Sequence, residues 1–451
     1  MSYRIRHGRL VIAWVPLVFA LIRASSATVD NYWDTQFGRV ETQGESLHAI
    51  GRFAVHDGSV YGGGRFSILN GQRATNIAKW DGARWIPLPT GPGSREEHFV
   101  EALVSHRELL YAAGSFNRAG SVSVSNIAAW NGREWSDLAG GMNGPVTVLA
   151  SYRGHLVAGG TFTEAGGVPA LNIAQWDGRV WSALGRGISR TNYACADCEE
   201  GLEIGRVRSL SCDARHLFVG GNFHRAGEMA ATNIARWNGI EWSALGNVLD
   251  GEVQQVAVVH DTVFAAGEFR TFGDVVWMAQ WKDWAWSPVG TGVLGPYGVV
   301  QALASNGRAL FVGGNFSRIG GVPASGLAVW DGTNWFPFGS GVSSGIDQGV
   351  TYLYAAPSAL CVGGVFSRAG STASTNAALW HVPQTLKVAP SVGQISISWP
   401  AADNEFVVET ARSLDQTNWT LLEQEPVIVN DRLTVTDPIF DGSVFFRLRR
   451  K

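Results

Sequence analysis

Two loops of this sequence carry side chains suited to acid–base catalysis. The candidates are Glu96, Glu97 and His98 in REEHF, and Tyr193, Asp197 and Glu199 in RTNYACADCEEGLEIG at 190–205. Carboxylates together with histidine or tyrosine can supply the acid and the base that break a glycosidic bond. No spacing holds two of these carboxylates across a bond, and adjacent glutamates on a loop are commonly just solvated. These residues are therefore candidates, and the sequence does not establish catalysis.

Four arginines form a second candidate set, because each follows a phenylalanine by two residues. They are Arg118, Arg225, Arg318 and Arg368. Guanidinium forks suit carboxylate and sulfate groups, so a ring of them on one face would bind an acidic ligand. The alternative is that each arginine contacts its own loop or water, as exposed charges commonly do. His224, next to Arg225, is a further candidate.

An internal repeat determines where both sets lie. Seven copies align on the second residue of a small-residue pair, at Gly64, Gly114, Gly160, Gly221, Gly267, Gly314 and Gly364. A phenylalanine follows each glycine by two residues, and a tryptophan follows the phenylalanine by 14 residues, or by 12 in the fifth copy. Six copies have a second tryptophan five residues later. Thirteen of the 19 tryptophans belong to this pattern, so we expect these in the core.

Successive copies of this glycine are 46 to 61 residues apart. A period of this length with short alternating apolar runs predicts one four-stranded blade per copy, and so a seven-bladed all-β propeller. Asp-Gly and Asn-Gly dipeptides between the two tryptophans predict tight turns, and are better explained as turns than as calcium ligands. The small-residue pair predicts close backbone approach between neighbouring blades. In such a blade the loops after the second and fourth strands leave on the same face. We therefore expect the arginines and both candidate catalytic loops on one face.

The seventh copy ends after Trp380 and lacks a fourth strand. NYWDTQFG at 31–38 resembles the missing strand, although Trp33 to Phe37 is one residue longer than Trp242 to Leu245. A strand supplied from the N-terminus would close the ring and remove its exposed edges. We expect a local bulge to absorb the extra residue.

The GG-x-F, N-x-A-x-W and W-D-G-x-x-W residues resemble the kelch-type repeats of secreted bacterial propellers, and are similar to those of fungal cortical polarity-marker propellers. The resemblance covers roughly residues 29–383. It implies a kelch-like propeller in an extracellular or cell-surface setting, and it transfers no catalytic residues. Kelch-type galactose oxidases are a possible enzymatic relative, but their copper ligands and Tyr–Cys crosslink have no recognisable counterpart in this sequence.

The two ends of the chain differ from the repeat. Arg4, Arg6 and Arg9 precede an apolar run at 10–22 and then small residues, so residues 1–27 read as a secretory signal peptide, with an uncleaved anchor as the alternative. Residues 28–383 form the predicted propeller. Residues 384–451 contain alternating runs such as QISISWP and SVFFRLRR, which predict a small β-sandwich similar to fibronectin-III-like tails.

Net charge, hydrophobic runs and motif content limit the classes of function that the sequence supports. A formal net charge of −3 gives no electrostatic case for nucleic acid, and no later segment is apolar and long enough for a membrane helix. Cys195 and Cys198 could form a local disulfide in an oxidising compartment, and no metal site or cofactor motif is recognised. The sequence favours a secreted or cell-surface, non-catalytic scaffold that binds an acidic glycan or a surface protein. The alternatives are a glycan-active lyase, hydrolase or oxidase using the longer loops, and a structural surface protein.

Overall fold

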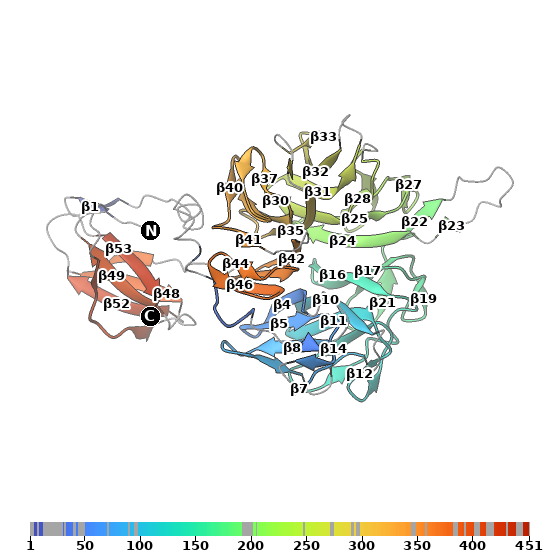
Figure 1. Cartoon of the computed structure of the whole chain (residues 1–451). Helices are drawn as coiled ribbons and strands as arrows, with labels where there is room; N and C mark the ends of the chain where they lie inside the picture. The colour runs from blue at the N-terminus through green and yellow to red at the C-terminus, as the bar shows by residue number, and fades with distance from the viewer. Residues whose placement is uncertain are drawn as a thin grey trace. The chain divides into compact units, whose positions relative to one another are not determined.

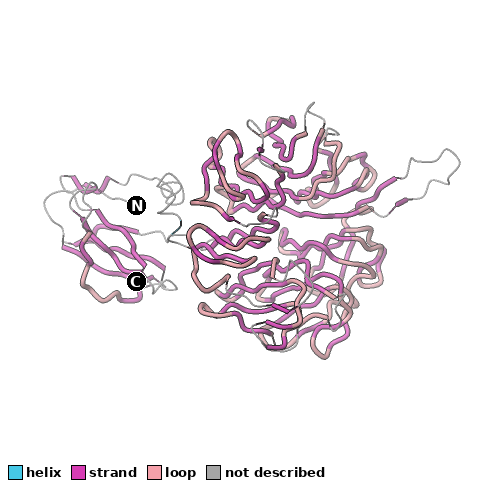
Figure 2. The backbone as a smooth tube through the Cα atoms, in the orientation of Figure 1, coloured by secondary structure: helices cyan, strands magenta, loops and turns pink. Residues whose placement is uncertain are grey.

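The computed structural model describes residues 4–6, 9–11, 30, 33–38, 42–43, 50–69, 72–88, 91–93, 98–191, 202–203, 205–246, 249–270, 275–289, 293–294, 298–343, 349–356, 359–381, 387–391, 394–400, 406–411, 419–429, 432–438 and 445–450. The elements assigned in these ranges are all strands, joined by loops in Figure 2. No helix in this part of the chain has the length and apolarity needed to cross a membrane. The chain divides into one unit of Trp33–Trp380 and a second of Met1–Tyr32 with His381–Lys451.

In the larger unit each repeat copy folds as an antiparallel sheet whose strands hydrogen-bond in chain order. The first three sheets consist of β4 (Arg52–His56), β5 (Ser59–Gly63), β8 (Ile77–Trp80) and β9 (Trp85–Pro87); of β10 (Phe99–His106), β11 (Leu109–Ser115), β14 (Ile127–Trp130) and β15 (Trp135–Ser136); and of β16 (Val146–Tyr152), β17 (His155–Gly160), β20 (Ile173–Trp176) and β21 (Trp181–Ala183). The fourth and fifth sheets consist of β24 (Arg206–Cys212), β25 (Leu217–Asn222), β28 (Ile234–Trp237) and β29 (Trp242–Ala244), and of β30 (Gln255–Val259), β31 (Thr262–Phe269), β32 (Val276–Lys282) and β33 (Ala285–Pro288). The sixth sheet consists of β35 (Val299–Ser305), β36 (Leu310–Asn315), β39 (Leu327–Trp330) and β40 (Trp335–Pro337), and the seventh of β42 (Val350–Ala355), β43 (Ala359–Gly364) and β46 (Ala377–His381).

The first strands of these sheets form the centre of the unit. Each lies beside the first strand of the next sheet, and β42 lies beside β4, so the series closes on itself. Figure 1 shows β4, β10, β16, β24, β30, β35 and β42 grouped at the middle with the other strands outside them. A closed ring of radially arranged antiparallel sheets is a β-propeller. The prediction of an all-β propeller is confirmed.

The N-terminal segment completes the last of these sheets. Trp33 forms an antiparallel bridge with Trp380, as Trp85 does with Trp80 inside the first sheet. The backbone N–H of Asp34 donates to the carbonyl of Leu379 at 2.8 Å. Residues 33–38 therefore lie along β46 in the position that a fourth strand holds in the other sheets.

The register of this segment differs from the prediction in one respect. The indole Nε1 of Trp85 donates to the carbonyl of Phe37 at 2.9 Å, just as Trp181 donates to Leu138 at 2.7 Å. Phe37 thus takes the place of the repeat's leucine. A turn, rather than a bulge, absorbs the extra residue: Asp34 Oδ1 accepts hydrogen bonds from the N–H groups of residues 36 and 37 at 2.8 and 2.9 Å.

The two positions of the small-residue pair are constrained by different neighbours. At the first, a Cβ on Gly63 would collide with the Val100 side chain of the next sheet, which agrees with close packing between blades. At the second, a Cβ on Gly221 would collide with the Arg206 carbonyl of its own sheet. The second glycine is therefore required by its contact with the first strand of its own sheet. The prediction that a neighbouring blade approaches it is wrong at this position.

The second-to-third loops are built into the ring. Most contain a two-stranded hairpin: β6 (Ile68–Leu69) with β7 (Gln72–Arg73), β12 (Arg118–Ala119) with β13 (Val122–Ser123), β18 (Glu164–Ala165) with β19 (Val168–Pro169), β26 (Arg225–Ala226) with β27 (Met229–Ala230), β37 (Arg318–Ile319) with β38 (Val322–Pro323), and β44 (Arg368–Ala369) with β45 (Thr372–Ala373). Each hairpin pairs with the loop that connects the fourth strand of the preceding sheet to the first strand of the hairpin's own sheet. The partners are β3 (Thr42–Gln43), Pro92, Met142, β22 (Ile188–Thr191), β34 (Val293–Leu294) and β41 (Val342–Ser343).

The asparagine that opens the third strand ties these loops together. Asn76 lies at φ +60, in the left-handed region that asparagine tolerates. Its Oδ1 accepts from Phe66 N–H at 3.0 Å, and its Nδ2 donates to the carbonyls of Pro92 and His98 at 3.0 and 2.9 Å. Asn172 makes the same kind of link to Phe162 and Ile188. This face is therefore held by a repeated set of hydrogen bonds.

The second unit contains two antiparallel sheets and a short hairpin. One sheet has the order β47 (Lys387–Ser391), β48 (Gln394–Pro400), β52 (Arg432–Pro438), β51 (Val427–Val429), and the other β50 (Thr420–Leu421), β49 (Phe406–Ala411), β53 (Phe445–Arg450). Ile397, Trp399, Val408 and Val435 are buried. The hairpin joins β1 (Arg4–Arg6) to β2 (Arg9–Val11) within the predicted signal region.

Candidate functional site

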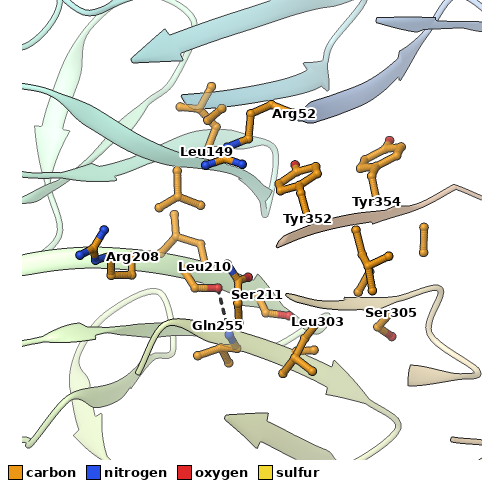
Figure 3. Close-up of a pocket in the computed structure, with 18 of the residues that line it drawn as sticks. Arg52, Leu149, Arg208, Leu210, Ser211, Gln255, Leu303, Ser305, Tyr352 and Tyr354 are labelled. Atoms are coloured by element: carbon orange, nitrogen blue, oxygen red, sulfur yellow. Dashed lines mark hydrogen bonds between the residues drawn. The ribbon is translucent and has the colours of Figure 1, made fainter. Parts of the chain in front are cut away.

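The first strands surround a cavity of about 390 Å³ on the axis of the ring. Its lining comes from all seven central strands, including Arg52 on β4, Glu101 on β10, Arg208 on β24 and Tyr352 on β42. Figure 3 shows labelled lining side chains from several sheets, including Arg52, Arg208 and Tyr352, with Arg52 and Tyr352 close together and Tyr354 next to Tyr352. No single blade could form this site, because the lining residues come from all seven sheets, with at most five from any one of them.

A repeated β-bulge places a polar residue at the start of the central strands. In β10 the register shifts between Val100 and Ala102, which leaves Glu101 unpaired. The same shift in four other sheets leaves Thr147, Arg208, Gln301 and Thr351 at the bulge. A bulge re-aims the side chain of its extra residue, and here four of the five residues line the cavity. The bulges lie at the end of the channel where the fourth-to-first loops enter.

The bulge explains the second glycine of the repeat. Val100, beside the Glu101 bulge, pairs with Gly114, and a Cβ on Gly114 would collide with the Phe99 carbonyl. The bulge brings this carbonyl over the glycine. The most regular residue of the repeat therefore permits the backbone distortion that points the variable residue into the channel.

Arg52 is the cation best placed for a ligand. Its Nε donates to the Glu101 carbonyl at 2.7 Å, and its guanidinium carbon lies 4.9 Å from the centroid of the Tyr352 ring. These contacts hold the side chain and leave its terminal nitrogens without a carboxylate partner among the described residues. Arg208 differs, since its Nε donates to Glu252 Oε1 at 2.8 Å. Arginine held by one nitrogen and stacked on an aromatic ring is preorganised to bind an anion.

Glu101 is the one carboxylate among the described residues that line this cavity. Burial raises the pKa of Glu101, and the positive charges of Arg52, Arg208 and Arg206 oppose that rise. Hydrolysis of a glycosidic bond normally needs two carboxylates at defined separation. Among the described residues the lining supplies one carboxylate, together with guanidinium, hydroxyl, amide and phenol groups.

The Glu101 pKa predicts how stability depends on pH. A carboxyl whose folded-state pKa is raised above its ordinary value of 4.5 favours folding at low pH, and this contribution is lost as pH rises through the folded pKa. We expect Glu101→Gln, which does not titrate, to gain stability relative to the wild type as pH rises from 4 to 8. Thermal unfolding of both proteins across that range tests this. A difference in Tm that stays constant with pH would contradict it.

The four predicted arginines lie on the hairpins of the expected face, and each one contacts its own turn. The acceptors are the carbonyls of Gly120 for Arg118, Glu228 for Arg225, Gly321 for Arg318 and Ser371 for Arg368. Arg225 also lies 3.9 Å from a Glu228 carboxylate oxygen. The guanidinium groups are thus used locally, while Arg118, Arg318 and Arg368 stay exposed.

The predicted catalytic candidates are placed only in part. His98 is buried at the entry to β10, where its carbonyl accepts a hydrogen bond from Asn76. His224 is half-buried and its backbone N–H donates to the Ser189 carbonyl at 3.0 Å. Glu96, Glu97, Tyr193, Asp197 and Glu199, with Cys195 and Cys198, lie outside the described residues. In the part of the chain that is described, no cluster of three or more His, Cys, Asp or Glu side chains is placed to hold a metal ion.

Sequence reasoning missed the channel residues. A signal was present: these central strands begin with V-x-x-L sequences, and the position after the valine holds Glu101, Thr147 or Arg208, which are polar residues inside an apolar strand. Alternation assigns this position to a sheet face and cannot reveal a bulge, because a bulge depends on the register with the next strand.

Comparisons with known proteins add similarity at the level of solved structures. No protein-family model and no curated protein sequence matches the chain. A structure described as YCF48 bound to D1 peptide has a TM-score of 0.44 and 13% identity, over 80% of this chain and 98% of that one. The WD40 beta propeller domain of Doa1 has a TM-score of 0.44 and 11% identity, over 77% of this chain and 96% of that one. Function is therefore inferred from this chain's own residues.

Proposed function

We propose that this protein is a secreted or cell-surface, non-catalytic scaffold that binds a ligand at the central channel. The proposed architecture is a seven-bladed kelch-like propeller closed by its N-terminal strand, followed by a small fibronectin-III-like sandwich. The pairing of Trp33 with Trp380 supports the closure. The two sheets at 387–450, with Trp399 buried, support the sandwich. The secretory setting rests on the sequence of residues 1–27.

The ligand of this proposal carries a carboxylate or sulfate group. The observation that carries it is Arg52, whose guanidinium is fixed by the Glu101 carbonyl and the Tyr352 ring without a carboxylate partner among the described residues. An acidic glycan or an acidic segment of a surface protein has the required group. The exposed arginines of the hairpins form a proposed outer rim for the same ligand.

Binding of the purified chain to uronate and sulfated polysaccharides and to acidic peptides, at low and physiological salt, tests the proposal. We expect Arg52→Gln to weaken binding about 10- to 100-fold, the range of a charge-assisted hydrogen bond. The double variant Arg318→Gln/Arg368→Gln tests the rim, because both side chains are exposed. Arg133→Gln is the matched control, because Arg133 is exposed in a third-to-fourth turn at the opposite end of its sheet.

Three outcomes separate the alternatives in the same experiment. Binding that is equally strong in Arg52→Gln would remove the channel from the proposal. Cleavage products would favour the glycan-active enzyme, whose candidate loop carboxylates lie outside the described residues. No retention of any acidic probe would leave the structural surface protein.

A further inference from the structure

One turn of the ring departs from the rule that the others follow. Between their third and fourth strands, five sheets use Asp-Gly or Asn-Gly, with the glycine at φ +92 to +110. The glycines are Gly82, Gly132, Gly178, Gly239 and Gly332. In the fifth copy Lys282 pairs with Ala285 around a two-residue turn made of Asp283 at φ +51 and Trp284 at φ +65. Both central residues of such a turn need a positive φ, which is why glycine is preferred.

Trp284 is therefore costly in two ways. A bulky side chain in the left-handed region is strained, and 77% of this side chain is exposed. Trp284 is not one of the repeat's core tryptophans, which in this copy are Trp281, half-buried, and Trp286, 8% exposed. The other turns show that the fold does not require an indole at this position. Trp284 is both strained and exposed, and the turn could form without it. This combination indicates that the side chain has a role other than forming the turn.

The surroundings of the indole are polar and held in place. The guanidinium carbon of Arg236, on β28 of the preceding sheet, lies 5.4 Å from the centroid of the Trp284 ring. Lys282, Asp283 and Ala285 beside it are exposed. One face of a rigid indole is thus backed by a cation, and hydrogen-bonding groups of both signs flank it. Arginine stacking of this kind fixes the ring without burying it.

The chemistry of this site distinguishes a sugar from a protein. A protein interface of ordinary size needs roughly 800 Å² of complementary surface on each partner. The other strongly exposed apolar side chains at such turns, Ile240 and Val180, lie on separate sheets, one per turn. A single ring on a tight turn, surrounded by charged groups, matches a ligand with one flat apolar face and a hydroxyl periphery.

We propose that Trp284, backed by Arg236, is a stacking platform for a neutral sugar ring of a glycan. The turn that carries it is at the opposite end of the sheets from the loops that enter the channel, because third-to-fourth and fourth-to-first connections leave from opposite ends. The platform is thus separate from the acidic-ligand site at Arg52, and either can exist without the other.

The test is affinity electrophoresis of the full chain in gels that contain soluble β-glucan, xylan or mannan. We expect retardation by at least one of these polysaccharides. Trp284→Gly should weaken the interaction at least 10-fold while leaving Tm at or above the wild-type value, because Asp-Gly is the preferred turn sequence. Trp284→Phe should keep measurable binding. Ile240→Gly, at a more exposed apolar residue of the neighbouring turn, is the matched control and should bind as the wild type does.

Any of three results would overturn the platform: no retardation by any of the three polysaccharides, unchanged binding by Trp284→Gly, or a fall in the Tm of Trp284→Gly that reveals a packing role. The Arg52→Gln variant should bind neutral polysaccharide normally. Failure of the platform with acidic-ligand binding intact, or the reverse, therefore identifies which of the two proposals is wrong.

Discussion

Gly221→Ala is expected to destabilise the propeller by about 3 kcal/mol, the upper end of the range for overpacking. A Cβ at this position would collide with the Arg206 carbonyl and crowd the Val207 backbone. Backbone cannot rotate aside as a flexible side chain can, so β24 must move away from β25 or lose its bulge. The bulge is what directs Arg208 into the channel, and ligand binding should therefore weaken together with stability.

Equilibrium denaturation and the polysaccharide and peptide binding assay together check this expectation. Gly51→Ala is the control, because a Cβ on Gly51 meets nothing within 4 Å and its free energy of unfolding should stay within about 0.5 kcal/mol of the wild type. Alanine already occupies the first position of the pair at 113 and 266, so the penalty belongs to the second position. A stable Gly221→Ala protein with normal binding would show that the bulge is not required.

Trp33→Ala should destabilise the protein by about 3–5 kcal/mol, the usual cost of emptying a large buried aromatic site. Trp33 is 2% exposed, and both Trp33 and Trp380 pack edge-on against Phe338, with ring centroids 5.9 and 4.9 Å away. Its loss also loosens the segment that covers the outer edge of β46. An uncovered edge strand pairs with other chains, so we expect self-association as well as a lower Tm.

Denaturation and size-exclusion chromatography measure the two effects of Trp33→Ala separately. Trp284→Ala makes the same chemical change at an exposed site and should alter the free energy of unfolding by no more than about 0.5 kcal/mol. A chain beginning after residue 38 should regain part of its Tm when a peptide of residues 29–43 is added. If that chain is as stable as the whole protein without the peptide, the segment does not close the ring.

The all-β repeat and the position of the N-terminal segment could be predicted from the amino-acid sequence alone. Turns, alternation and the spacing of tryptophans are local features, and their recurrence requires the same local structure in each copy. Trp33 could be matched to the missing strand because the seventh copy lacks its fourth strand, which leaves one edge of its sheet unpaired. The turn at Asp34 could not be told from a bulge, since both absorb one residue.

The placement of the candidate ligand-binding residues depends on contacts between segments that are distant in the sequence. Equal spacing suggested a shared ring for Arg118 and its equivalents, but each guanidinium has a carbonyl two or three residues away that accepts its hydrogen bond. Arg52 and Glu101 are 49 residues apart and meet because their strands are neighbours around the axis. Trp284 falls among motif tryptophans in the sequence, yet its position in a turn leaves it exposed. Register, side-chain aim and exposure depend on neighbouring strands, which no single segment encodes.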